Sequence, residues 1–405
     1  MELHYPLILD GSTGTQLQKR GYDGGVCAEA WSIDHPEVVR DFQKEYLQAG
    51  SQVLYSPTFG ANRVKLEENG IFNKVYDFNY KLASISKKIA GDKAYVAGDI
   101  APTGKFLAPL GDTPFEEMVE IYTEQAKGLQ DAGVDFFIIE TMMTVPEARA
   151  ALLAVKSVSD KPVFVTFSVD EKGNTLTGSD IEAVLEIMQG MGADAFGLNC
   201  SVGPKEMLES IKRLTDYAEV PLIAKANAGL PKVVDGKTVY DCPPETFADC
   251  VPGLARAGVQ IFGGCCGTMA EHVKAIADAV KNVKLVNPNP KYTDLLPLCT
   301  EKKLFLLPKD VKPGKILPCD ENLGEALEEA ETDDEKLITV QIRREDELDN
   351  FADYQYAIYK PLCLMCEDEN ILEQALRLYQ GRAMYDGNLP EDFLRKMGKK
   401  YGLIY

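Results

Sequence analysis

Eight short apolar runs recur along the first 285 or so residues, and segments with helical patterning separate them. Each run is short and apolar, as expected of a strand that is buried on both faces of a parallel sheet. The runs are 7–12, 52–58, 94–100, 134–141, 163–170, 195–201, 222–229 and 259–267. Between them, helix signals recur; the segment 35–50, for example, has Pro36 near its start and stops at Gly50. The pattern predicts strands that alternate with helices.

Eight strand–helix repeats within about 285 residues match the size of a (β/α)8 barrel, the TIM barrel. The alternative is a doubly wound open sheet, which seldom needs eight units and carries a glycine-rich phosphate loop after its first strand. The stretch DGSTGTQ (10–16) is not such a loop. We therefore expect an α/β fold of the TIM-barrel class.

The pattern changes after residue 286. A stretch rich in proline and asparagine (287–297) follows, and the segment 320–335 has nine acidic residues and no basic one. Strand and helix patterns then alternate again in 336–342, 345–355, 360–366, 369–380 and 381–388. The sequence predicts three parts: a barrel (1–286), a linker with an acidic segment (287–335), and a small C-terminal α/β appendage (336–405).

Charge and composition exclude several classes of partner. The formal net charge of −20 argues against nucleic acid or an anionic membrane surface as a partner. No apolar run reaches the roughly 18 residues that a membrane span requires, and the N-terminus lacks the features of a signal peptide. The ten cysteines are scattered through a chain too large to need disulfides. We expect a cytoplasmic protein with free thiols.

Polar or small residues stand at the ends of most predicted strands. In a barrel, the carboxyl ends of the strands converge on one mouth, where the chemistry takes place. These positions are Asp10, Gly11, Ser12, Thr58, Asp99, Glu140, Asn199, Cys200, Asn227, Cys265 and Cys266. The alternative for any single position is a polar turn residue without function. That alternative is weakest for the cysteines.

Three cysteines at the strand ends are candidates for one metal site: Cys200, Cys265 and Cys266. Neighbouring residues of a regular strand point to opposite faces, so both members of the pair reach one ion only if the backbone leaves regular β geometry. Glycines on both sides of the pair supply that freedom: Gly263, Gly264 and Gly267. The same geometry makes the pair a poor fit to core packing.

Three thiolates with one open position are typical of catalytic zinc, whereas structural zinc is closed by four protein ligands. None of the three histidines stands at a strand end, which disfavours a hydrolytic zinc site. A trithiolate site is already negative; it suits the binding and deprotonation of an incoming thiol better than the generation of hydroxide. The alternatives are inert buried thiols, a strained disulfide between neighbours and structural zinc. For Cys363 and Cys366, packing is the better interpretation.

Several motifs resemble, in order, the homocysteine-binding barrel of the homocysteine S-methyltransferase family. They are LILDGSTGTQL (7–17), SPTFGANRVKL (56–66), GDIAPTG (98–104), IIETM (138–142), TLTGSD (175–180), GLNCSVGP (197–204), ANAGLP (226–231) and IFGGCCGT (261–268). Within the family, the chain most resembles the N-terminal homocysteine-binding module of cobalamin-dependent methionine synthase. The likeness covers about residues 5–285.

The resemblance implies a set of site residues. Zinc is expected on Cys200, Cys265 and Cys266, with the homocysteine thiolate as the fourth ligand. The amino and carboxylate groups of homocysteine are expected near strands one and four, at Asp10, Gly11, Ser12 and Glu140. This agrees with simple chemistry, because an ammonium prefers a buried carboxylate and a carboxylate prefers N–H donors. Weaker supporting candidates are Thr58, Asn199 and Asn227.

The tail carries a second resemblance. Residues 360–388 are similar to a strand–helix–strand piece of the methyltetrahydrofolate-binding barrel of methionine synthase, but the surrounding units of that barrel are missing. We therefore do not infer folate binding from this resemblance, and no cobalamin-binding module is expected. The methyl donor is then a corrinoid carried by a partner protein, or a small onium compound.

The expected function is a zinc-dependent S-methyltransferase that converts homocysteine into methionine. One rival is a different thiol acceptor, or the reverse demethylase direction. Another is a subunit that binds thiol and zinc without catalysis on its own, in a multi-component corrinoid methyltransferase system. Neither the donor nor the oligomeric state is predicted.

Overall fold

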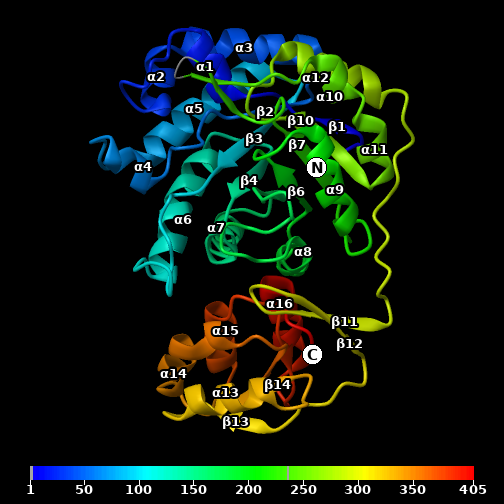
Figure 1. The fold of residues 1–405 in the computed structure, drawn as a ribbon. Helices are drawn as coiled ribbons and strands as arrows, with labels where there is room; N and C mark the ends of the chain where they lie inside the picture. The colour runs from blue at the N-terminus through cyan, green and yellow to red at the C-terminus, as the bar shows by residue number, and fades with distance from the viewer. Residues whose placement is uncertain (1–2, 235–236) are drawn as a thin grey trace. The chain divides into compact units, whose positions relative to one another are not determined.

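The computed structural model describes residues 3–234 and 237–405. The chain forms two compact units. The first comprises residues 1–176, 194–215 and 220–288, and the second comprises residues 177–193, 216–219 and 289–405. Figure 1 shows both units, coloured along the chain.

The first unit is built on an eight-stranded parallel sheet in the order β1-β10-β7-β6-β5-β4-β3-β2. Its strands are β1 (Leu7–Ile8), β2 (Val53–Tyr55), β3 (Tyr95–Ile100), β4 (Phe136–Met142), β5 (Val163–Phe167), β6 (Ala195–Asn199), β7 (Leu222–Ala226) and β10 (Val259–Gly264). Each overlaps one of the eight apolar runs, and β4 extends one residue beyond its run. The prediction of a TIM-barrel fold is confirmed.

Helices of this unit surround the strands (Figure 1). They are α1 (Thr13–Lys19), α2 (Ala28–Asp34), α3 (Pro36–Ala49), α4 (Arg63–Glu68), α5 (Val75–Ala90), α6 (Phe115–Asp131), α7 (Val145–Val158), α9 (Pro204–Leu214), α10 (Pro244–Ala248), α11 (Val251–Arg256) and α12 (Ala270–Val280). As the sequence predicts, α3 ends at Gly50, in a left-handed conformation. A short hairpin that the sequence pattern does not predict, β8 (Lys232–Val234) with β9 (Lys237–Val239), follows β7.

The barrel closes between β1 and β2 through both backbone and side-chain hydrogen bonds. The Gln52 N–H donates to the Ile8 carbonyl at 2.8 Å, and the Ile8 N–H donates to Gln52 Oε1 at 2.8 Å. Inside the barrel, one apolar cluster draws side chains from all of its strands, including Leu7, Phe136 and Ile261. This core supports the mouth of the barrel from below.

The second unit contains a parallel sheet whose strands lie in chain order: β13 (Ile316–Pro318), β14 (Ile338–Gln341), β15 (Leu362–Met365) and β16 (Met384–Tyr385). Its helices are α8 (Ile181–Gly190), α13 (Leu323–Thr332), α14 (Glu347–Tyr354), α15 (Glu369–Leu378) and α16 (Glu391–Tyr401), with a 3₁₀ turn at Gln355–Ala357. The antiparallel hairpin β11 (Leu295–Cys299) and β12 (Leu304–Pro308) packs on the sheet, where Leu298 and Leu307 cluster with Cys363. An α/β fold is present in the C-terminal part of the chain, as expected, while the predicted appendage of residues 336–405 as a separate part stays a prediction.

Residues 287–335, for which we expected a linker with an acidic segment, contain β11, β12, β13 and α13. The acidic stretch forms α13, which buries Leu323 and Leu327. How the chain divides into functional domains stays a prediction. Among the described residues, no helix is long and apolar enough to span a membrane.

Candidate metal and thiol site

The carboxyl ends of β6 and β10 bring three thiols together. Cys200 follows β6, and Cys265 and Cys266 follow β10. The three sulfur atoms lie within 4.8 Å of one another, and the Sγ atoms of Cys200 and Cys266 are 3.9 Å apart. Cysteines some 65 residues apart in the sequence therefore form one cluster, as the strand spacing predicts.

The backbone leaves β geometry at Cys200. Its φ is +62°, and that of Ser201 is +59°, both in the left-handed region that residues with a side chain seldom occupy. The Cys200 N–H still donates to the Lys225 carbonyl at 3.2 Å, while its own carbonyl accepts from the Val202 N–H at 2.7 Å. This local turn aims the thiol inward, and such strain is typical of functional sites.

The Cys265–Cys266 pair sits in a turn just beyond β10. The Cys265 N–H donates to the Ala226 carbonyl at 2.7 Å, and the Cys266 carbonyl accepts from Ala228 at 2.9 Å. Both contacts join the pair to the end of β7. Neighbouring thiols reach the same side because they lie in this turn rather than in a strand.

Two glycines make that turn feasible. A Cβ on Gly264 would lie 2.4 Å from Thr268 Oγ1, too close for any side chain. Gly267 has a φ of +78°, which favours glycine. The sequence expectation that glycines permit the turn therefore has a concrete physical basis at these two positions.

Two asparagines hold the cysteine loops. Asn199 Nδ2 lies 3.8 Å from the Cys265 sulfur and donates to Thr141 Oγ1 at 2.7 Å, while Asn199 Oδ1 accepts from Thr166 Oγ1 at 2.9 Å. Asn227 Oδ1 accepts from the Cys266 N–H at 3.1 Å. Both asparagines thus orient the thiols from the ends of their strands.

The cluster fits a tetrahedral metal ion. With metal–sulfur bonds of about 2.3 Å, the edge of a tetrahedron of sulfurs is about 3.8 Å, close to the separation of Cys200 and Cys266. A hydrogen bond with the Cys200 thiol, followed by burial, raises the pKa of Cys265 to about 12. Three adjacent thiols therefore resist ionisation by themselves, and a dication is what would stabilise them as thiolates.

A cavity of about 600 Å³ opens beside the sulfurs. Its lining includes Ser12, Asp99, Glu140, Lys225, Cys265 and Cys266. Tyr240, after the β8–β9 hairpin, also lines it, and burial and the nearby Cys266 sulfur raise the pKa of this tyrosine. The cavity thus places polar groups of several strand ends next to the thiols.

Glu140 forms a buried ion pair that the sequence analysis missed. Lys225 Nζ lies 3.3 Å from Glu140 Oε2, and both side chains are almost fully buried. Nζ also lies 4.1 Å from the centre of the Tyr55 ring. Burial opposes the charge, but Glu140 and other nearby groups raise the pKa of Lys225 well above its ordinary value. The available signal was a lysine inside the apolar run 222–229.

At the first strand end, Asp10 is fully buried. Its Oδ2 accepts the Tyr55 N–H at 2.8 Å, which ties β1 to β2. Burial raises the pKa of Asp10 to about 7, against the opposing effect of Lys225. Asp10 therefore supports the barrel closure, and it is not among the residues that line the cavity.

The two residues after Asp10 lead into α1, which begins at Thr13. A Cβ on Gly11 would come within 2.8 Å of the Tyr46 ring, so the chain passes too close there for a side chain. Ser12 caps the helix: its Oγ accepts the Thr15 N–H at 3.1 Å, and it lines the cavity. At the end of β2, Thr58 is buried and donates to the Asp99 carbonyl at 2.7 Å.

The fold and the site define a (β/α)8-barrel protein with a three-cysteine cluster at its mouth that is compatible with a bound metal ion. The family model described as homocysteine S-methyltransferase matches residues 7–280. The chain belongs to the homocysteine S-methyltransferase family.

Among similar proteins, the methionine synthase of Mycobacterium tuberculosis is 33% identical over 298 residues, which cover 69% of this chain and 25% of that protein. The methionine synthase of Mycobacterium leprae is 33% identical over 294 residues, covering 68% and 24%. The chain thus spans about a quarter of the length of these relatives.

Solved structures support the same fold. The homocysteine methyltransferase MmuM from Escherichia coli, in its oxidized form, superposes with a TM-score of 0.57 at 22% identity, covering 67% of this chain and 95% of that one. Its metallated form gives 0.56 at 21% identity with the same coverage. At this identity the likeness concerns the fold.

Proposed function

We propose that this chain is a zinc-dependent S-methyltransferase that moves a methyl group to the thiolate of homocysteine and yields methionine. The convergence of three cysteine sulfurs within 4.8 Å carries the proposal. Family membership supports it, as do relatives named methionine synthase and a fold neighbour described in a metallated form. A reducing cytoplasm is the proposed compartment, because the thiols must stay reduced.

Cys200, Cys265 and Cys266 are the residues that would hold zinc. A zinc ion bound there would supply one open coordination position and would lower the pKa of a substrate thiol. The protein's own part is to fix the three sulfurs in place through the loop contacts of Asn199 and Asn227. Such supporting contacts tune the basicity and orientation of metal ligands.

The cavity would orient the rest of the substrate. We propose that the ammonium of homocysteine lies against Glu140, while its carboxylate lies at the turn of Asp10, Gly11 and Ser12, on the side of Ser12, which lines the cavity just before α1. A helix N-terminus favours a negative group, and a buried carboxylate favours a cation. Thr58 would support the site indirectly, through its bond to the backbone of the third strand end.

The reaction is a direct displacement. The electron pair of the homocysteine sulfur attacks the methyl carbon of the donor, and the bond between that carbon and the donor breaks with its electrons leaving to the donor. Positioning the sulfur and excluding water are the contributions that the chain makes. The donor proposed is a corrinoid on a partner protein or a small onium compound.

A panel of donors tests the proposal. The purified chain is analysed for zinc and incubated with homocysteine and methylcobalamin, betaine or S-methylmethionine in turn. We expect about one zinc per chain and methionine formation. Product only after addition of a methylated corrinoid protein would favour a thiol- and zinc-binding subunit of a multi-component system, and methylation of another thiol alone would change the acceptor. Absence of both zinc and thiol binding would overturn the proposal.

A further inference from the structure

Three carboxyl groups meet one lysine at the mouth of the barrel. Asp10, Asp99 and Glu140 come from the ends of β1, β3 and β4, and they are 0%, 4% and 5% exposed. Burial first, and then the negative charge of Glu140, raises the pKa of Asp99 well above its ordinary value. The facing cation is Lys225, which also acts on Asp10 and Asp99. The group as a whole is short of positive charge.

The three carboxyl groups differ in their partners. Asp10 Oδ2 accepts the Tyr55 N–H, and Glu140 Oε2 pairs with Lys225. Asp10 Oδ1 and Asp99 Oδ1 are both buried acceptors without a hydrogen-bond partner, but of these two residues Asp99 lines the cavity and Asp10 does not. A buried acceptor without a partner is unfavourable, so its presence calls for an explanation.

Asp99 is held firmly in place. Its N–H donates to Ser56 Oγ at 3.0 Å, and its carbonyl accepts from Thr58 Oγ1 at 2.7 Å. Asp99 lines the same cavity as Glu140, Cys265 and Cys266. Strand β3 pairs directly with β4, with Ile100 opposite Ile139, so the two acidic strand ends are neighbours. This is a preformed acceptor beside the thiols.

We propose that Asp99 is a specificity-determining residue, whose carboxylate joins Glu140 in binding the ammonium group of an amino-thiol substrate. This inference rests on the proposed function. An ammonium has three N–H donors to satisfy, and Lys225 already occupies one oxygen of Glu140. Asp99 supplies the additional acceptor, and the substrate supplies the missing positive charge.

The test compares homocysteine with 4-mercaptobutyrate, which has the same thiol and carboxylate but no amino group. Binding of each thiol to the zinc-loaded protein is measured by calorimetry for the wild type and for Asp99→Asn. We expect Asp99→Asn to weaken homocysteine binding about 10- to 100-fold and to leave 4-mercaptobutyrate binding unchanged or tighter. Asp99→Glu should restore part of the preference for homocysteine.

Asp135→Asn is the matched control. Asp135 precedes β4, at the opposite end of the strand, where it accepts the Val96 N–H and pairs with Lys87. Its replacement should leave the ratio of the two affinities unchanged. Equal losses for both thiols in Asp99→Asn would show a merely structural role and overturn the inference, as would equal affinities in the wild type. A wild type that binds neither thiol would refute the proposed function itself.

Discussion

Both units are built on a parallel sheet, but the sheet closes into a barrel in the first unit and stays open in the second. Each contains a parallel sheet, whose strands run in chain order apart from the inserted hairpin β8–β9 of the barrel and alternate with helices. In the first unit eight strands curve into a barrel, so their carboxyl ends face one mouth. In the second unit four strands form an open sheet, and the hairpin of Leu298 and Leu307 covers part of it. Closure decides whether strand ends share a site.

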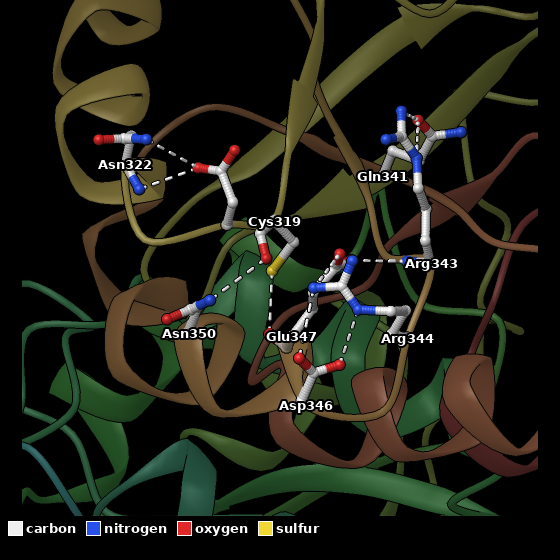
Figure 2. Close-up of polar contacts among 9 residues, drawn as sticks. Cys319, Asn322, Gln341, Arg343, Arg344, Asp346, Glu347 and Asn350 are labelled. Carbon is white, nitrogen blue, oxygen red and sulfur yellow. Dashed lines mark hydrogen bonds and ion pairs between the residues drawn. The ribbon is translucent and has the colours of Figure 1, made fainter.

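Polar groups at the strand ends show the consequence. In the second unit they satisfy one another, as Figure 2 shows for Arg344 with Asp346 and for Arg343 with Glu347. Arg344 Nε donates to Asp346 Oδ1 at 3.0 Å, and the Arg343 N–H donates to Glu347 Oε2 at 2.7 Å. In the barrel, Asp10 Oδ1 and Asp99 Oδ1 remain buried without partners. Of these two, Asp99 lines the cavity and Asp10 does not, so the unpaired acceptor of Asp99 is the one that indicates a ligand.

The cysteines follow the same division. At the ends of β13 and β15, Cys319 donates to the Glu347 carbonyl at 3.2 Å and Cys366 to that of Asp368 at 3.5 Å. Cys363 packs in the core of the second unit. Within residues 3–234 and 237–405, the cluster of three cysteines is the group suited to a metal. A single thiol at a strand end is therefore not enough for a metal site; several thiols must converge on one point.

The largest expected effect comes from replacing one converging thiol. Cys266→Ser, like Cys265→Ser, should reduce zinc from about one to below about 0.1 per chain and abolish homocysteine binding. Cys366→Ser, in the second unit, should retain both. Elemental analysis and thiol titration after equal dialysis measure the difference. Full zinc content in Cys266→Ser would break the contrast between the two sets of cysteines.

The buried ion pairs give the next largest effect. Lys225→Met leaves Glu140 without its partner among other carboxyl groups, and should lower the free energy of unfolding by about 3–5 kcal/mol. The only tryptophan, Trp31, belongs to the barrel, so urea unfolding followed by its fluorescence reports on this unit. The double variant Lys225→Met/Glu140→Gln should recover part of the loss. If the double variant recovers none of the lost stability, the broken ion pair of Lys225 and Glu140 is not the cause of the destabilisation.

Arg382→Met is the counterpart in the second unit. Arg382 pairs with the fully buried Glu186 at 2.8 Å, but the arginine itself is 17% exposed. Burial already raises the pKa of Glu186. In Arg382→Met, protonation of Glu186 therefore recovers part of the stability that the lost ion pair provided. We expect a smaller destabilisation than for Lys225→Met, measured by circular dichroism.

A pH dependence follows from Asp10. Its pKa in the folded chain is about 7, above the ordinary 3.8, so the folded state binds more protons between these values. Stability contributed by the protonated form is therefore lost as the pH rises toward 7. Relative to Asp10→Asn, the wild type should lose about 2–3 kcal/mol between about pH 5 and about pH 8. Parallel stability curves for the two proteins would contradict a raised pKa.

The sequence pattern predicts the barrel well because its strands are buried on both faces, and such strands are short apolar runs. The three cysteines were predictable for a related reason: strand ends in a barrel must converge. Lys225 was missed because a single charge in an apolar run does not reveal its partner, which comes from β4. The hairpin of β11 and β12 was missed because its prolines, Pro297 and Pro308, indicate a boundary, while its stability comes from tertiary burial of leucines.

The smallest expected effect concerns the closure of the barrel. Between β1 and β2, Gln52 Oε1 accepts the Ile8 N–H in place of a backbone carbonyl. Gln52→Ala removes this acceptor and should destabilise the barrel by about 0.5–1.5 kcal/mol, since water replaces part of the bond. Gln52→Glu retains an acceptor and should cost less. Asp10 stands next to this junction, and Asp99 belongs to the neighbouring strand. Hydrogen exchange at the amides of Ile8 and Tyr55 is the more direct measurement, because these N–H groups form the hydrogen bonds across the junction. If exchange at both amides stayed as slow in Gln52→Ala as in the wild type, the side chain would not be what closes the sheet, and the difference between the closed and the open unit would rest on the backbone and on Asp10.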